Sequence, residues 1–126
     1  MDALAGFRSD VAITVVLGFS CTFTEEVHRR NREQGNRFAI VERAGNMQEL
    51  MRDAGLAVTA LGTTIYELAF LGVPAMVISN YWEDARDEQE LEKLGCVMPL
   101  GFHANLSPEH IRKAMDAVWA DCRMRM

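Results

Sequence analysis

The sequence is poor in the features that mark several large classes of protein. Its three cysteines, Cys21, Cys96 and Cys122, are odd in number and far apart, so they match neither a disulfide framework nor a zinc-binding pattern. No apolar run approaches the roughly 20 residues that span a membrane. The N-terminus lacks the charged start and apolar core of a signal peptide. These absences predict a cytoplasmic protein without a membrane span.

Basic charge is also scarce. The net charge is −5, and lysine and arginine form no clustered patch, which argues against nucleic acid as a partner. The local basic groups are interpreted as solvated helix faces: Arg29, Arg30, Arg32, Arg123 and Arg125. No pair among His28, His103 and His110 has the spacing of metal ligands. We therefore expect no metal and no other cofactor.

What the sequence does have is a regular alternation of apolar and amphipathic segments. Hydrophobic residues make up 49% of the 126 residues, enough for the core of a single domain over residues 1–126. Expected strands cover residues 11–17, 38–41, 56–60, 75–79 and 96–98; expected helices cover 22–34, 46–54, 64–71, 87–94 and the segment from 108 onward. This order predicts an α/β, Rossmann-like fold, with a mostly parallel sheet and helices on both faces.

The most informative stretch is Leu56–Ser79, which predicts strand, tight turn, helix, second turn and strand. The first turn, Gly62-Thr63-Thr64, places backbone N–H groups and two hydroxyls at the start of a helix, where a phosphate binds well. Glu67 follows one turn later, where it could meet a sugar hydroxyl. Two simpler interpretations stay open: the glycine turn only links strand to helix, or Glu67 caps its own helix in a box with Thr64.

Further candidates follow the strand 75–79, at the sheet edge where open α/β proteins bind ligands. Tyr81 and Trp82 could stack on a base or a sugar ring, or cover a partner surface. A neighbouring acidic cluster could serve acid–base chemistry or form a solvated helix start; it comprises Glu83, Asp84, Asp87 and Glu88. His103, after the last expected strand, is the one histidine near this edge.

Taken in order, several short motifs resemble a known family. They are Asn46-Met47-Gln48-Glu49-Leu50-Met51 continuing to Val58, Leu61-Gly62-Thr63-Thr64 with Glu67, Leu71-Gly72-Val73-Pro74, Asp87-Glu88-Gln89, and Leu91-Glu92-Lys93-Leu94-Gly95. This series resembles the C-terminal, nucleotide-sugar-binding half of GT-B glycosyltransferases of the MurG type. Within that family it is most similar to the SpsG/PseG-like UDP-sugar hydrolases or transferases.

The resemblance implies a set of roles. Gly62, Thr63 and Thr64 would approach the diphosphate, Glu67 would contact the ribose hydroxyls, and Gln89 would face the donor sugar. It implies a UDP-sugar-binding domain of a glycosyltransferase or UDP-sugar hydrolase in surface polysaccharide or glycan biosynthesis. In this family the acid–base residue comes largely from the N-terminal half, so no catalytic residue is named in this chain and efficient catalysis is expected to need that absent half.

Two departures from the family pattern bear on these expectations. Leu61 stands where the family usually has a first glycine, so the backbone would approach phosphate less closely. The family's first strand, central in the expected order 3-2-1-4-5, has no counterpart before residue 11. Such a sheet must close directly or borrow a strand, which predicts a homodimer or a separate N-terminal-half partner. The alternative is a non-catalytic partner-binding subunit, or a truncated fragment that dimerises without independent activity.

Overall fold

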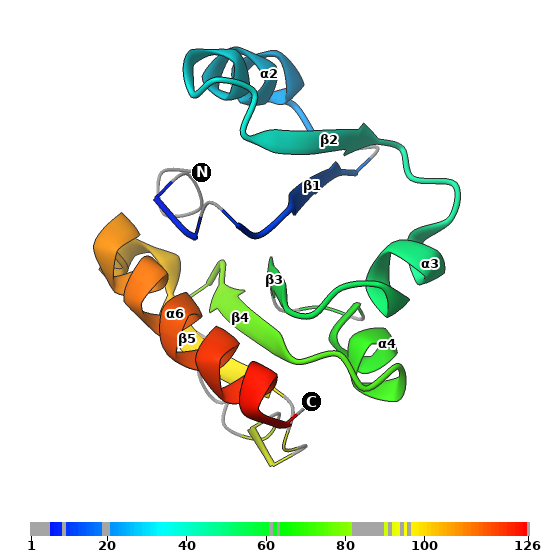
Figure 1. Cartoon of the computed structure of the whole chain (residues 1–126), viewed down its shortest axis with the longest axis vertical. Helices are drawn as coiled ribbons and strands as arrows, with labels where there is room; N and C mark the ends of the chain where they lie inside the picture. Colours follow the sequence, from blue (N-terminus) through cyan, green and yellow to red (C-terminus); the bar gives the residue numbers. More distant parts are fainter. Residues whose placement is uncertain are drawn as a thin grey trace. The chain divides into compact units, whose positions relative to one another are not determined.

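The computed structural model describes residues 6–8, 10–18, 21–60, 62, 64–81, 90, 92–93, 95 and 97–125 (Figure 1). The chain divides into two compact units, Met1–Met47 and Gln48–Met126. Strands and helices alternate along the chain, and every strand pairing is parallel. The predicted α/β, Rossmann-like class is therefore confirmed, while a single domain over residues 1–126 stays a prediction.

The first unit is built on one parallel strand pair. β1 (Ile13–Leu17) pairs with β2 (Phe38–Glu42), and the register sets Ile13 opposite Phe38. The helix α2 (Thr24–Glu33) connects the two strands. Among the described residues of this unit, four apolar side chains are buried: Phe7, Leu17, Val27 and Phe38. The core formed by the described residues is thus small.

The two ends of α2 are closed in different ways. The sequence suggests a capping box from Thr22 to Glu25, but this is wrong: the N-cap is Phe23, and no side chain caps the helix. Acidic side chains in the first turn complement the helix dipole instead. At the other end Gly35 has φ +71°, and the Asn36 N–H donates to the Asn31 carbonyl at 2.8 Å. This is the Schellman stop that the glycine predicts.

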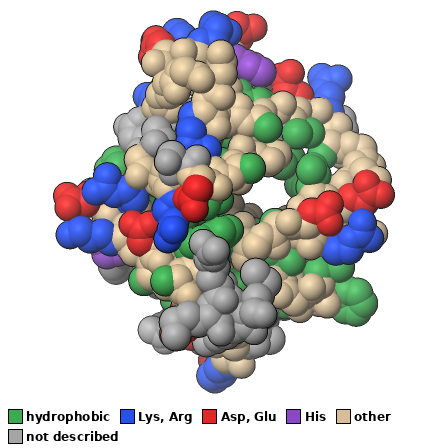
Figure 2. Space-filling view, in the orientation of Figure 1, with side chains coloured by type: hydrophobic (Ala, Val, Ile, Leu, Met, Phe, Trp, Pro, Cys, Tyr) green, Lys and Arg blue, Asp and Glu red, His purple; other side chains and the backbone are tan. Residues whose placement is uncertain are grey.

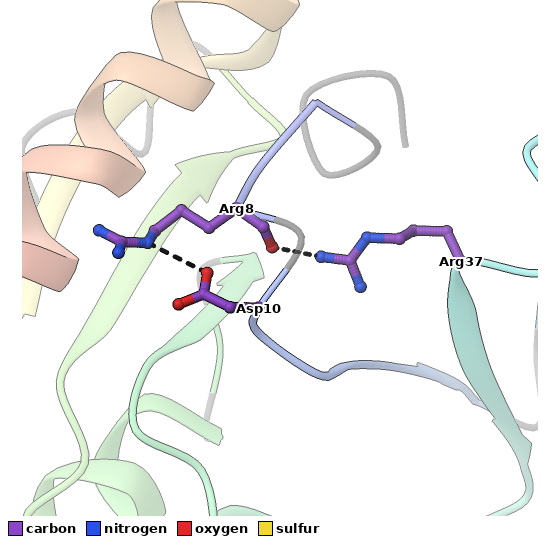
Figure 3. A network of polar contacts seen from close by, with 3 residues as sticks. All are labelled: Arg8, Asp10 and Arg37. Atoms are coloured by element: carbon purple, nitrogen blue, oxygen red, sulfur yellow. Dashed lines mark hydrogen bonds and ion pairs between the residues drawn. The ribbon is translucent and has the colours of Figure 1, made fainter.

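Side-chain hydrogen bonds connect the start of β2 to helix α2 and to the segment before β1. The buried Asn31 amide donates to the Phe38 carbonyl and accepts from the Phe38 N–H, both at 2.9 Å. Arg37 Nη2 donates to the Arg8 carbonyl at 2.6 Å, and Arg8 Nε lies 3.4 Å from Asp10 Oδ1 (Figure 3). Helix α2 and the segment before β1 are thereby both fixed to the start of β2.

The second unit holds a three-stranded parallel sheet in the order β3-β4-β5. Its strands are β3 (Ala57–Ala60), β4 (Ala75–Ser79) and β5 (Val97–Phe102), and its helical elements are α3 (Met47–Arg52, at the boundary between the units), α4 (Thr64–Phe70), η2 (His103–Asn105) and α6 (Pro108–Arg125). Ile65 of α4 packs with Val77 and Val97 in the core. Apolar residues occupy most of β4 because this strand is covered on both faces.

Turn and cap residues position α4 and α6 as the sequence predicts. Gly72, with φ +73°, ends α4: its N–H donates to the Ala69 carbonyl, and the Val73 N–H donates to the Leu68 carbonyl at 2.9 Å. Ser107 Oγ accepts the His110 N–H at 3.1 Å, and α6 then begins at a proline. These residues fix where α4 ends and where α6 begins.

The strand pairings bear on the expected strand order. β1 and β3 belong to different sheets. The helix expected over residues 87–94 lies largely outside the described residues.

Candidate functional site

The carboxyl ends of β3, β4 and β5 lie at one edge of the second sheet, because the three strands are parallel and in register. Ala60 pairs with Ile78, and Ile78 pairs with Gly101. The segments that leave this edge carry Gly62 after β3, Tyr81 after β4 and His103 after β5. Ligands of open α/β sheets bind at this kind of edge. The sheet therefore gathers three of the candidate residues that the sequence singles out.

Gly62 is exposed, and its surroundings are open. A Cβ added at Gly62 would meet no atom within 4 Å, and its φ is outside the left-handed range in which four other glycines lie. Its carbonyl accepts the Ile65 N–H at 3.4 Å, which closes the turn into α4. Neither packing nor backbone conformation among the described residues requires a glycine here. A glycine at this position lets another molecule come close to the backbone.

Helix α4 presents two different faces. Ile65 and Leu68 are almost fully buried and hold the helix against the sheet, at 0% and 2% exposure. The Glu67 carbonyl accepts the Leu71 N–H at 3.1 Å, whereas its exposed carboxylate makes no hydrogen bond or ion pair with another described residue. Thr64 is the first residue of the helix rather than the residue before it, so a capping box with Thr64 as N-cap does not form. The Glu67 carboxylate is thus available to a ligand.

Some of the predicted site residues cannot be placed. Gly62, Thr64 and Glu67 are brought together at the start of α4, whereas Thr63 and Gln89 lie outside the described residues. So do Trp82 and the acidic cluster of residues 83, 84, 87 and 88. The described part of the candidate site is therefore Gly62 and the first turn of α4.

The remaining candidates are exposed or have structural partners. Tyr81 is 67% exposed, and the exposed His103 ring stacks edge-on against Phe102 with centroids 4.6 Å apart. His28 Nε2 lies 3.6 Å from Glu42 Oε2, which gives it a structural role between α2 and β2. Among the described residues no group of histidine, cysteine, aspartate or glutamate could hold a metal ion. Tyr81 and His103 stay candidates for contact with a ligand.

One feature of α4 was missed by sequence reasoning. Tyr66 and Phe70 are 62% and 91% exposed and lie one turn apart on the helix, beside Glu67. The signal was available, because aromatic residues four apart share a helix face opposite the buried Ile65 and Leu68. On the face that Figure 2 shows, acidic and basic side chains are interspersed.

The helices of the described part include none that is long and apolar enough to cross a membrane.

Comparison with known proteins gives two similarities. Over 117 residues, or 93% of this chain, it is 25% identical to the spore coat polysaccharide biosynthesis protein SpsG of Bacillus subtilis. Over 80 residues, or 62% of this chain, it is 34% identical to the uncharacterized protein MJ1062 of Methanocaldococcus jannaschii. No family model matches the chain, and no solved structure matches it significantly. The relation to SpsG is distant but covers most of the chain.

The chain is much shorter than both relatives. The matched stretches make up 34% of SpsG and 16% of the archaeal protein. With 93% of this chain matched to SpsG, that match includes the turn before α4 and the helix itself.

Proposed function

We propose that this chain is a nucleotide-sugar-binding domain that takes a UDP-sugar, in a glycosyltransferase or UDP-sugar hydrolase system of polysaccharide biosynthesis. Two findings support the proposal. The chain is distantly similar to SpsG, whose name assigns it to spore coat polysaccharide biosynthesis. The second finding carries the proposal. Gly62, at the carboxyl edge of the sheet, has open space around it, and the Glu67 carboxylate in the first turn of α4 has no partner among the described residues.

Each residue of the proposed site has a chemical role. The backbone N–H groups of the turn and the hydroxyls of Thr63 and Thr64 donate hydrogen bonds to the diphosphate, and Gly62 lets the phosphate oxygens come close. Because α4 has only seven residues, the individual amides contribute more than the helix dipole. Glu67 accepts hydrogen bonds from the ribose hydroxyls. Gln89 faces the donor sugar.

Catalysis at the anomeric carbon needs an acid–base group. In this proposal, that group does not come from this chain. The chain therefore binds the donor, and a second polypeptide completes the reaction centre. That polypeptide is a separate N-terminal half or a second copy of the chain. A cytoplasmic location stays a prediction.

Calorimetric titration with UDP tests the site. Replacing the carboxylate in Glu67→Gln leaves ribose hydroxyls imperfectly paired, so we expect affinity to fall by about 1–3 kcal/mol, or roughly five- to 150-fold. Glu49→Gln is the matched control: Glu49 is also an exposed glutamate in the first turn of a short helix without a described ion pair. We expect this control to bind as the parent does.

Two results would contradict the proposal. Equal UDP affinity for Glu67→Gln and the parent would remove the ribose role of Glu67. Absence of saturation transfer from the parent to both UDP and UDP-N-acetylglucosamine would remove the nucleotide-sugar function altogether.

A further inference from the structure

The strand β5 contains a bulge close to its carboxyl end. Val77 of β4 pairs with Pro99. The next residue of β4, Ile78, pairs with Gly101, so Leu100 is an extra residue of β5. Gly101 adopts φ +104°, in the range that favours glycine. Bulges of this kind change the direction of the side chains that follow them, and they recur beside active sites.

The bulge decides on which face of the sheet Phe102 lies. Side chains alternate between the two faces along a strand, so one extra residue moves each later side chain to the opposite face. Phe102 pairs with Ser79 and shares its face, which is also the face of Val77. Val77 packs with Ile65 of α4 in the core. Phe102 therefore lies on the α4 face, at the same carboxyl edge from which the segment with Gly62 leaves.

Phe102 in turn holds the ring of His103 at this edge. The two rings meet edge-on, with centroids 4.6 Å apart and an interplanar angle of 63°, which is a favoured arrangement of aromatic pairs. The chain then turns into η2, where the His103 carbonyl accepts the Leu106 N–H at 3.2 Å. The exposed imidazole has no hydrogen bond or ion pair with another described residue. Its two nitrogens can therefore donate to and accept from a ligand.

The width of the sheet edge determines which part of a nucleotide sugar can reach His103. Neighbouring strands are about 4.8 Å apart, so the end of β5 lies about 10 Å from the end of β3, with β4 between them. In the proposed site the turn after β3 holds the diphosphate. Helix α4 connects two parallel strands, so it runs back from this edge, and Glu67 holds the ribose along it. The sugar, at the other end of the diphosphate, is then the part that extends across β4 toward β5.

We propose that His103 binds the donor sugar of a UDP-sugar and that the bulge at Leu100 and Gly101 positions it for this contact. The inference rests on the proposed nucleotide-sugar function and adds to it a residue that recognises the sugar. One imidazole nitrogen forms a hydrogen bond with a hydroxyl group of the sugar, so His103 distinguishes a UDP-sugar from UDP. Gly101 and Phe102 are positioning residues, because they act on the sugar only through His103.

Calorimetric titration of the intact chain with two kinds of ligand tests the proposal. UDP is compared with UDP-N-acetylglucosamine, UDP-glucose and UDP-galactose, and the UDP-sugar that the parent binds most tightly is used for the variants. His103→Phe keeps an aromatic ring beside Phe102 but removes both ring nitrogens. We expect this variant to bind the UDP-sugar about three- to tenfold more weakly, the effect of losing one hydrogen bond, and to bind UDP as the parent does.

A second histidine of the same unit supplies the matched control. His110 is also exposed, and among the described residues its side chain makes no hydrogen bond or ion pair. It lies in the first turn of α6, after η2. We expect His110→Phe to bind both UDP and the UDP-sugar as the parent does.

Two glycines with positive φ test the role of the bulge. Gly101→Ala strains the backbone at φ +104° and disturbs the turn that places His103, so we expect weaker binding of the UDP-sugar with UDP affinity retained. Gly72→Ala imposes the same kind of strain at φ +73°, at the far end of α4. We expect it to keep the parent's affinity for both ligands. If Gly101→Ala does not fold, His103→Phe decides the question.

Three results would overturn the proposal while UDP binding by the parent upholds the nucleotide site. One is that the parent binds none of the three UDP-sugars more tightly than UDP. Another is equal UDP-sugar affinity for His103→Phe and the parent. The third is an equal loss of affinity for UDP and the UDP-sugar in His103→Phe, which would place His103 at the nucleotide. A parent that binds neither UDP nor any UDP-sugar contradicts the proposed function and, with it, this inference.

Discussion

At the scale of single residues, the polar side chains of Asn31 and Glu67 differ in how the fold uses them. Asn31 is 7% exposed and forms hydrogen bonds with both backbone groups of Phe38, which would otherwise be buried without partners at the start of β2. Glu67 is exposed and leaves its carboxylate unused by described residues. The fold explains the side chain of Asn31 but gives no role to the carboxylate of Glu67. That contrast makes Glu67, rather than Asn31, the residue to test for function.

Replacement of Asn31 should weaken the first unit. Asn31→Ala leaves the N–H and C=O of Phe38 without partners, so we expect the free energy of unfolding to fall by about 2 kcal/mol. Urea unfolding followed by the Phe38 amide signal measures the effect. The exposed neighbour Arg32 gives the control, since Arg32→Ala should change stability by less than about 0.5 kcal/mol. Equal urea midpoints for the two variants would show that the Asn31 pair is not stabilising.

At the scale of helices and strands, the sequence predicts what local chemistry controls. The strand Ala75–Ser79 has the bounds that its apolar run and Pro74 suggest, and α6 begins at Pro108 after its Ser107 cap. Capping at Thr22 was wrong, because α2 begins after Phe23 and local sequence defines a helix start only to within one or two residues. The exposure of Phe70 depends on which α4 face meets the sheet, so it follows from packing rather than from the residue itself.

The two glycines that flank α4 should respond differently to substitution. Gly72 has φ +73°, so Gly72→Ala forces an alanine into a left-handed conformation at a cost of about 1 kcal/mol. Gly62→Ala meets open space without a positive φ and should leave the urea midpoint unchanged. Circular dichroism in urea compares the two variants. If Gly62→Ala destabilised the chain as much as Gly72→Ala does, Gly62 would be a structural glycine and the candidate site would lose its main support.

At the scale of the whole chain, the sequence predicts the α/β class because alternation of strands and helices is a local pattern repeated along the chain. The division into a two-stranded and a three-stranded sheet depends on which strands pair across long separations. The resemblance in motif order suggests a missing central strand, and it leaves direct closure and a borrowed strand as alternatives.

The unequal cores of the two units predict unequal local stability. The second unit contains Ile65, Leu68, Met76 and Val77 with 2% exposure or less. Of the described apolar residues in the first unit, Phe38 is the most buried, at 4% exposure, and it belongs to a two-stranded sheet. Native-state hydrogen exchange should therefore be slowest at the β4 amides, and the β1 and β2 amides should exchange through openings of lower free energy. The exchange is followed by NMR at increasing urea concentration. If β2 amides matched those of β4 throughout, the two units would open together, and the small core of the first unit would not limit its stability.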